Sequence, residues 1–269
     1  MGIFIFLILL GAFMVFPIYI AIISSIKPIN ELFIMPPKLY SLDPTLDNFK
    51  DLFQVANNSW VPFSRNVFNS LFVTITATVF HVIFACMAAF ILAKCRFPGG
   101  KLLNKIVVIS LLFNSTVTYI MQYIVMAGMG MINTYAALIF PLIPASMGLF
   151  LMIQSIGQIP DAMIEAAKVD GASLFSICWG IVMPNSRPAL MTIIIFEFQA
   201  AWNAAGGSVV YDEALKTIPT VVQQIALAGL SRQGAIAASA VVLMIPPLVI
   251  FIIAQGQVME TMAHAGMKD

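Results

Sequence analysis

The stretch QIPDAMIEAAKVDGASLFSICWGIVMPNSRP, residues 158–188, carries the strongest local signals in the chain. Pro160 suits the first turn of a helix, and Asp161 complements the positive N-terminal end of that helix. Gly171 can supply the left-handed residue that ends it. The spacing therefore predicts a short helix over about residues 160–170.

A second apolar stretch follows this turn. Ser173 can cap it, and the stretch runs through Met183 to Pro184, where a helix is expected to stop. In the first helix, Glu165–Ala167 place one charge beside two methyl-sized side chains, so another protein could approach the backbone closely. These residues alone leave two interpretations open: a docking helix for a partner, or a loop folded on the bilayer surface.

The composition places most of the chain in lipid. Of 269 residues, 61% are hydrophobic and 9% are charged, and the mean hydropathy is +0.98. A soluble domain has about a quarter of its residues charged, so it could not cover this much apolar surface. The net charge of +1, without long charge runs, gives no sign of nucleic-acid binding. Three cysteines without CxxC spacing and two histidines indicate neither a disulfide framework nor a metal site.

Apolar runs of membrane-crossing length predict an all-α integral membrane protein with six transmembrane helices in one domain, residues 1–269. The expected spans are about 3–23, 67–93, 106–127, 135–153, 189–205 and 234–254. The run Ile218–Leu230 has 13 residues, which is too short to cross and fits an interfacial or re-entrant piece.

Several of these spans carry prolines, among them Pro141 and Pro144 in the fourth and Pro246 and Pro247 in the sixth. Proline removes a backbone donor and bends a helix. The bends either enclose a pathway or are ordinary packing kinks.

Basic residues in short loops give the orientation. Four of them crowd the loop after the second span: Lys94, Arg96, Lys101 and Lys105. The connection 128–134 has none, so we expect residues 94–105, and with them 154–188, to lie in the cytoplasm. The segment 26–66 also carries four basic residues on the side assigned to the outside, so the orientation rests on the short loop.

Residues 158–188 resemble the EAA loop of the permease subunits of ABC importers. The family pattern is Glu-Ala-Ala, three residues, Gly, nine residues, Ile, one residue, Leu-Pro, and Met183 stands here where Leu is usual. The matching positions are Glu165, Ala166, Ala167, Gly171, Ile181 and Pro184. The longer string, with Asp170–Ala172 and the later Phe198 and Trp202–Asn203, is similar to the smaller permease of maltose-type carbohydrate importers.

This resemblance implies a type I ABC importer permease fold in the bacterial plasma (inner) membrane. The chain would form one half of a heterodimeric pore with a second permease, two ATPase subunits and an extracellular solute-binding protein. It would import sugars or oligosaccharides by alternating access, with ATP and Mg bound by the ATPase subunits and no cofactor of its own. The short cytoplasmic helix would be a coupling helix, and the docking residues would be Glu165, Ala166, Ala167, Asp170, Gly171, Ala172 and Pro184.

The loop WNAAGGSVVYDEALKT, residues 202–217, corresponds in the family to a scoop that reaches into the sugar-binding protein. Its expected contact residues are Gly206, Gly207, Tyr211 and Asp212, with Glu213 extending the polar reach. A passive turn is the alternative. Loops on rigid scaffolds often carry function, which favours the scoop.

Polar residues within the spans are the candidates for the translocation path. Glu197 is the only carboxylate deep in a predicted span; it is either functional or paired with the partner permease. Asn69, Asn114, Gln122 and Asn203 could face sugar hydroxyls or bond neighbouring helices. His81 is explained by a hydrogen bond to a backbone carbonyl. In maltose-type systems, sugar contacts come mainly from the longer partner subunit.

Enzymatic activity is not expected. Gly229 and Gly234 have the GxxxxG spacing of a phosphate loop, but Ala235–Ile236 stand where Lys and Ser or Thr are needed. An intramembrane enzyme would require paired acids, a nucleophile with a base, or a metal cluster in the spans. The alternative within transport is an ion-gradient-driven secondary carrier, which would need internal repeats and coupling carboxylates beyond Glu197.

Overall fold

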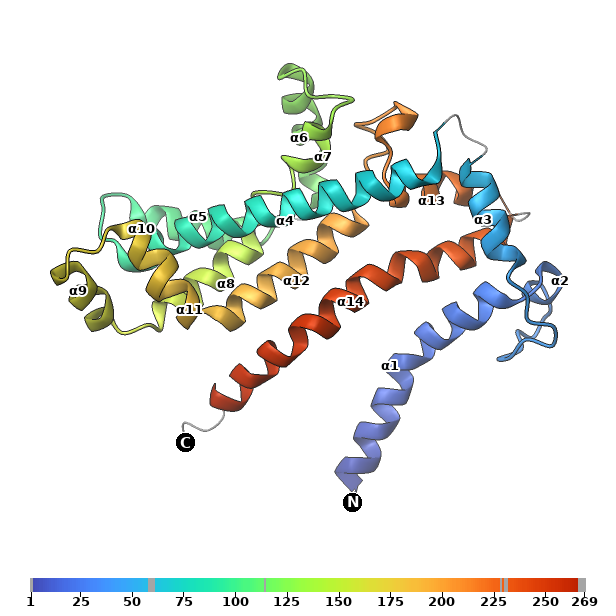
Figure 1. The fold of residues 1–269 in the computed structure, drawn as a ribbon, viewed down its shortest axis with the longest axis horizontal. Coiled ribbons are helices and arrows are strands. Elements are labelled where there is room, and N and C mark those ends of the chain that lie inside the picture. Colours follow the sequence, from blue (N-terminus) through green and yellow to red (C-terminus); the bar gives the residue numbers. More distant parts are fainter. Residues whose placement is uncertain (1, 58–60, 114, 228, 230–231, 266–269) are drawn as a thin grey trace. The chain divides into compact units, whose positions relative to one another are not determined.

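The computed structural model describes residues 2–57, 61–113, 115–227, 229 and 232–265, and the regular elements in this part of the chain are helices (Figure 1). The chain divides into two compact units. One contains Met1–Ser70 with Asp212–Pro246, and the other contains Leu71–Tyr211 with Pro247–Asp269.

The first unit is built on apolar helices with a small core. Its elements are α1 (Gly2–Ile26), α2 (Ile29–Leu32), α3 (Asp47–Asn57), the first turns of α4 (Phe63–Lys94), η2 (Glu213–Leu215), α13 (Ile218–Leu227) and the first half of α14 (Gln233–Ala265). The core contains Leu52 of α3, Ile225 of α13, and Ala235 and Ala238 of α14. Helix α1 contacts α3 and exposes its apolar side chains along most of its length, as expected for a helix surrounded by lipid.

The first turns of α4 hold the segment around η2 and the start of α13. Asn66 Nδ2 donates to Lys216 O (2.9 Å), and Asn69 Nδ2 donates to Ala214 O (2.9 Å) and Lys216 O (3.0 Å). Ser70 Oγ accepts a hydrogen bond from Ile218 N (2.7 Å). These side chains satisfy backbone groups that would otherwise be buried without partners.

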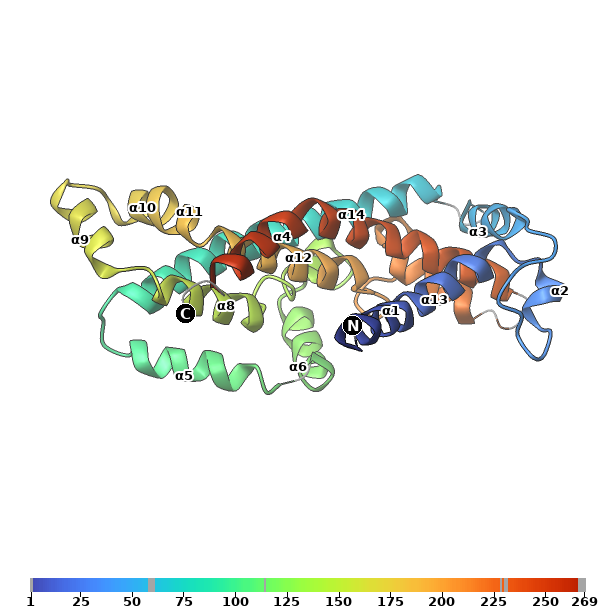
Figure 2. The ribbon, with the colours of Figure 1, turned by 90° about the horizontal axis from the view of Figure 1, so that it is seen from below.

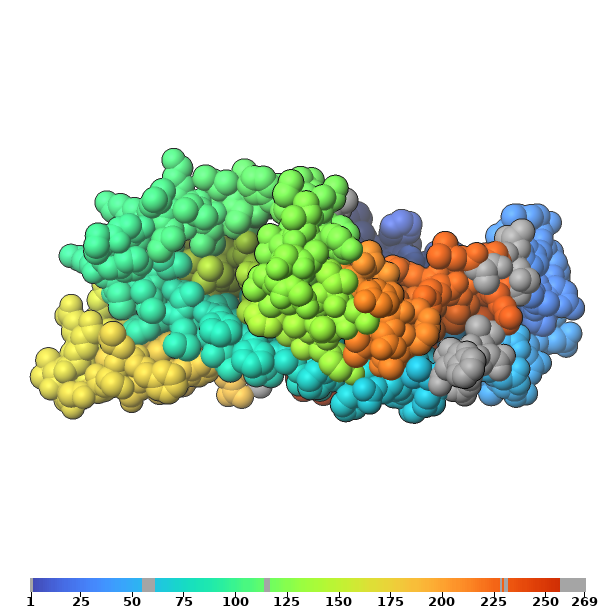
Figure 3. Space-filling model, turned by 90° about the horizontal axis from the view of Figure 1, so that it is seen from above, coloured from blue at the N-terminus to red at the C-terminus, as the bar shows by residue number. Residues whose placement is uncertain are grey.

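The second unit packs around the remainder of α4. It contains α5 (Gly100–Ser110), α6 (Ser115–Gly128), α7 (Tyr135–Ile139), α8 (Ser146–Gly157), α9 (Asp161–Val169), α10 (Leu174–Ile177), the π-helix η1 (Cys178–Val182), α11 (Met183–Asn185) and α12 (Arg187–Asn203). Helices α8 and α12 lie side by side (Figures 1 and 2). Met152 and Ile156 of α8 and Ile193 of α12 join Ala85, Cys86, Ala89 and Phe90 of α4 in one core. Helix α5 has no buried residue and, with α6, lies on the surface in Figure 3.

Within the part of the chain that the structure describes, three continuous helices are long and apolar enough to cross a membrane: Gly2–Ile26, Phe63–Lys94 and Gln233–Gly256. They coincide with the first, second and sixth predicted spans, and α14 continues through Pro246 and Pro247. Helix α12 has 17 residues and lies at the predicted fifth span.

The predicted third and fourth spans are not single helices. Residues 106–127 are divided between α5, which ends at Ser110, and α6, which begins at Ser115. Residues 135–153 are divided between α7 and α8, because Pro141 and Pro144 lie in the gap and cannot donate backbone hydrogen bonds. The six-span topology therefore remains a prediction, in which the third and fourth spans would be formed by broken helices.

Gly148 on α8 allows α4 and α8 to approach closely. A Cβ at this position would lie 2.1 Å from His81 Nε2. The imidazole cannot easily move away, because it is 2% exposed and its Nδ1 is 2.7 Å from Ile143 O. That contact confirms the predicted hydrogen bond of His81 to a backbone carbonyl.

We expect Gly148→Ala to destabilise the purified protein by about 1–3 kcal/mol, the usual cost of overpacking. Thermal unfolding in detergent would show this as a lower Tm. Gly157→Ala, at the end of the same helix, is the matched control because nothing lies within 4 Å of its added Cβ. A second variant, Gly148→Ala with His81→Ser, should lose less stability than the sum of the single changes; strict additivity would contradict the proposed clash.

Candidate functional site

Helix α9 turns sharply away from α8 and exposes part of the Glu-Ala-Ala motif. The bend between Ser146–Gly157 and Asp161–Val169 is 79°. Ile164 and Ala167 are buried in the core of the second unit, whereas Glu165 and Ala166 are exposed. Ala167, predicted as a docking residue, therefore packs the helix in place, and its two neighbours form the accessible part of the motif.

The helix ends in a left-handed turn at Gly171, whose φ is 80°. Gly171 N donates to Lys168 O (3.1 Å), and Ala172 N donates to Ala167 O (3.0 Å), as in a Schellman-type end. Asp170 and Gly171 are exposed, and Ala172 is half-buried. The structure confirms the predicted short helix and its glycine turn.

The second helical stretch of the loop ends one residue after Pro184, where it was predicted to stop. Ser173 Oγ accepts from Ser176 N (3.2 Å), which confirms the predicted cap. The helical run α10–η1–α11 then passes the exposed Pro184 and ends at Asn185. The wider π-helical turn before Pro184 provides the irregularity that a proline imposes on a helix.

Large apolar side chains are exposed on α9 and on the adjoining α10. Val169 is 87% exposed and Phe175 is 65% exposed, and Met163 and Leu174 are also exposed. Exposed apolar side chains with polar residues beside them are typical of a surface that binds another protein.

The loop that follows α12 is anchored at its base and open at its tip. Gly206 is buried against Leu138, where a Cβ would meet Cδ2 at 2.2 Å, whereas Gly207 is exposed. Asn133 binds the loop twice: its N donates to Val209 O (2.8 Å), and its Oδ1 accepts from Tyr211 N (3.2 Å). The Tyr211 side chain is 73% exposed, so it is free to contact a partner.

Two predicted scoop residues serve local structure. Asp212 Oδ1 accepts from Ala214 N (2.9 Å) at the start of η2. Glu213 forms an ion pair with Lys216, whose side chain is 6% exposed. Asp212 is exposed and can still meet a partner, but part of its hydrogen-bonding capacity is already used.

A cavity of about 450 Å³ in the second unit brings together residues predicted for different roles. Gln122 of α6 and Asn203 of α12 line it, together with Gly206 and Tyr119. Its other walls are largely apolar: Met126, Ala137, Leu138, Pro141, Leu142, Ala200, Ala204, Ala205 and Val209. Such a cavity, with few polar groups on an apolar wall, is typical of a small-molecule site. Tyr119, whose hydroxyl contacts Ser208 Oγ, was missed, although an aromatic ring with a polar tip in an apolar run was a usable signal.

The other predicted path residues lie elsewhere. Asn69 is fully buried and uses its amide protons on backbone carbonyls, so it holds structure rather than lining a path. Glu197 is 4% exposed, does not line this cavity, and its Oε1 has no hydrogen-bond partner among the described residues. Asn114 lies outside the described residues.

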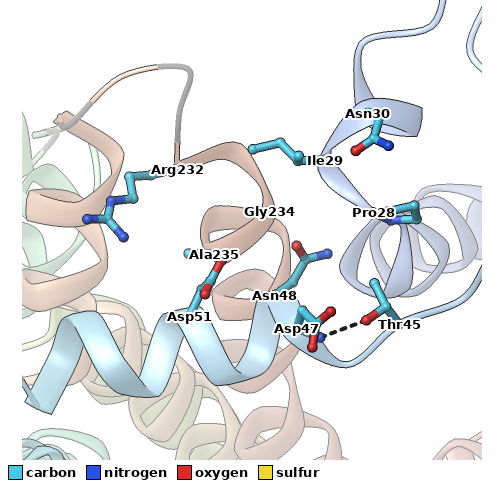
Figure 4. A pocket seen from close by; sticks show the side chains of 10 residues that line it. All are labelled: Pro28, Ile29, Asn30, Thr45, Asp47, Asn48, Asp51, Arg232, Gly234 and Ala235. Atoms are coloured by element: carbon cyan, nitrogen blue, oxygen red, sulfur yellow. Dashed lines mark hydrogen bonds between the residues drawn. The ribbon is translucent and has the colours of Figure 1, made fainter.

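The first unit contains a polar pocket that the sequence did not indicate (Figure 4). Its volume is about 230 Å³, and charged and amide side chains surround it, namely Asn30, Asp47, Asp51 and Arg232. Asn48 donates from Nδ2 to Ser25 O (2.9 Å) and Lys27 O (2.7 Å), and a Cβ at Gly234 would meet its Oδ1 at 2.1 Å. Asn48 therefore fastens α3 to the end of α1, and the start of α14 approaches it closely at Gly234.

Glu31 organises the chain beside this pocket. Its carboxylate accepts from Leu42 N (3.1 Å), Asp43 N (3.2 Å) and Ser41 Oγ (3.1 Å). Burial raises the pKa of the Glu31 carboxyl, but these hydrogen bonds and the charge of Lys27 outweigh burial and leave the pKa below its usual value. The carboxylate thus closes the loop 31–43 on itself.

Comparison with known proteins agrees with this architecture. The family described as "Binding-protein-dependent transport system inner membrane component" matches residues 58–262. The protein LplC of Bacillus subtilis (strain 168) is 30% identical over 81% of this chain and 72% of its own length. The sn-glycerol-3-phosphate transport system permease protein UgpE of Escherichia coli O1:K1 / APEC is 28% identical over 91% of this chain and 89% of its own.

Two solved structures have a similar fold. The first is a bacterial ABC transporter involved in the import of the acidic polysaccharide alginate, with a TM-score of 0.77, 20% identity, and coverage of 94% of this chain and 93% of the other. The second is a bacterial alginate ABC transporter in complex with an alginate pentasaccharide-bound periplasmic protein, with a TM-score of 0.65, 17% identity, and coverage of 93% and 92%.

Proposed function

This chain belongs to the family of binding-protein-dependent transport system inner membrane components, and from that premise we propose that it is one half of a pore that imports a sugar or oligosaccharide. Members of this family are multi-pass permease components of the bacterial inner membrane and are not enzymes. The proposed complex adds a second permease, two ATPase subunits that bind ATP and Mg, and an extracellular solute-binding protein. Transport would proceed by alternating access.

The observation that carries the coupling part of this proposal is the geometry of α9. A short helix set at 79° to α8 exposes Glu165 and Ala166 between apolar side chains, and its end is fixed by the turn at Gly171. A rigid element with an exposed small-residue face can insert into a cleft of an ATPase subunit. Closure of the ATPase pair would then move α9 and the helices packed behind it.

The cavity between α6, α7 and α12 supports a carbohydrate substrate. The amides of Gln122 and Asn203 can bond sugar hydroxyls, and the Tyr119 ring offers an apolar face. Two of the similar proteins are named for what they transport: UgpE for sn-glycerol-3-phosphate, and the alginate importer for an acidic polysaccharide. The described residues that line this cavity are uncharged, which favours a neutral saccharide at this half of the pore.

The test is to tag the C-terminus, purify the protein in mild detergent at low expression, and identify by mass spectrometry what co-purifies. We expect an ATPase and a second permease. A protein that purifies alone and moves solute without ATP would overturn the proposal and favour the ion-gradient-driven secondary carrier.

A further inference from the structure

Lys94, the last residue of α4, is bound at the joint between α8 and α9. Its side chain is 7% exposed. Its Nζ donates to Ile159 O (2.5 Å), to Asp161 Oδ1 (2.7 Å) and to Gly157 O (3.3 Å). An ammonium group has three protons, so three acceptors satisfy it completely. A buried ammonium that is fully satisfied in this way marks a defined position rather than a solvated surface charge.

The three acceptors all belong to the bend that aims α9. Gly157 is the last residue of α8, whose C-terminal carbonyls carry partial negative charge, and Asp161 is the first residue of α9. The pKa of the Asp161 carboxyl lies below its usual value, first because Lys94 donates a hydrogen bond to it, and then because of the charges of Lys94, Arg96 and Lys168. One side chain therefore holds the end of one helix and the beginning of the next.

We propose that Lys94 is a positioning residue that fixes the direction of α9 relative to α4 and passes the movement of α9 on to α4. This inference rests on the proposed docking of α9 to an ATPase subunit. Helix α4 has 32 residues and contains neither glycine nor proline, so it lacks the usual causes of a kink and can transmit a displacement along its length.

The test measures the distance between α9 and α4 by double electron–electron resonance in the purified complex, with and without its ATPase. The native cysteines are first replaced by Cys86→Ala, Cys95→Ser and Cys178→Ala. Spin labels are then attached at Val169→Cys, which is 87% exposed on α9, and at Ile91→Cys, which is 44% exposed on α4. Neither label site is one of the three residues that accept hydrogen bonds from Lys94.

We expect Lys94→Met to broaden and shift this distance distribution and to reduce uptake while the ATPase stays bound, because the exposed face of α9 is unchanged. Lys94→Arg should keep both the wild-type distance distribution and wild-type uptake, since a guanidinium can donate to the same acceptors. Asp161→Asn should have a smaller effect because the two carbonyl contacts remain. Lys101→Met, which removes an exposed basic residue from the first turn of α5, is the matched control and should behave as wild type.

A Lys94→Met protein with the wild-type distance distribution would overturn the inference. A Tm that is equally lowered in Lys94→Met and Lys94→Arg would also overturn the inference, because the residue would then serve stability alone. If the wild-type preparation brings no ATPase, the proposed function fails instead, and the distances in the isolated permease still decide whether Lys94 fixes α9.

Discussion

Replacing Gly171 by valine is expected to release the ATPase subunit and abolish ATP-driven uptake. Gly171 has φ of 80°, a conformation that costs a residue with a side chain about 1–2 kcal/mol, and a β-branched residue tolerates it least. The strain would be relieved by unwinding the end of α9, which moves Glu165 and Ala166 out of register with their partner. The measurement is the amount of ATPase that co-purifies per permease, followed by uptake in cells carrying the complete system.

Two further variants make this result specific. Gly171→Asn should keep most ATPase binding, because asparagine visits the left-handed region more readily than other residues with side chains. Gly180→Ala, in the π-helical segment of the same loop, adds a Cβ with nothing within 4 Å and should be neutral. Valine and asparagine variants that retain ATPase equally well would remove the glycine turn from the coupling mechanism.

The cytoplasmic loop could be predicted from sequence because its determinants are local. Pro160 and Gly171 set the two ends of α9, and Ser173 caps the next helix, all through contacts within a few residues. Pro141 and Pro144 likewise mark the break in the fourth span, but the break in the third span could not be placed in this way. At that break, Ser110 Oγ donates to Ser146 Oγ (2.7 Å), a contact across 36 positions that no local pattern reveals.

The candidate site could not be assembled from local sequence patterns either. Gln122, Asn203 and Gly206 were selected separately, and only the fold places them around one cavity. Asn69 was assigned to the path because a polar residue in an apolar run suggests one, yet it bonds carbonyls 145 and 147 positions away. Lys94 was used only to orient the chain. Its role in holding α8 and α9 requires knowledge of where three distant acceptors meet.

Shortening the loop across residues 206–213 is expected to leave assembly with the ATPase intact and to lower uptake strongly. The loop is separate in sequence from α9, and its exposed tip, with Gly207 and Tyr211, is the part that could reach a solute-binding protein. The cut also removes Gly206 from the wall of the cavity and Ser208 from Tyr119. Uptake and the affinity of the purified transporter for its binding protein are the two measurements.

Asn133→Ala tests the support of the loop tip independently of the residues at the tip. It keeps all loop residues but removes the Oδ1 contact to Tyr211 N, and it places alanine at a φ of 62° that asparagine tolerates better. We therefore expect an intermediate loss of uptake, while Tyr211→Ala, which removes an exposed side chain and keeps the anchor, should lower binding-protein affinity without changing Tm. If the shortened loop imports at the wild-type rate, the loop is a passive turn and the binding protein must engage another outer segment of the pore.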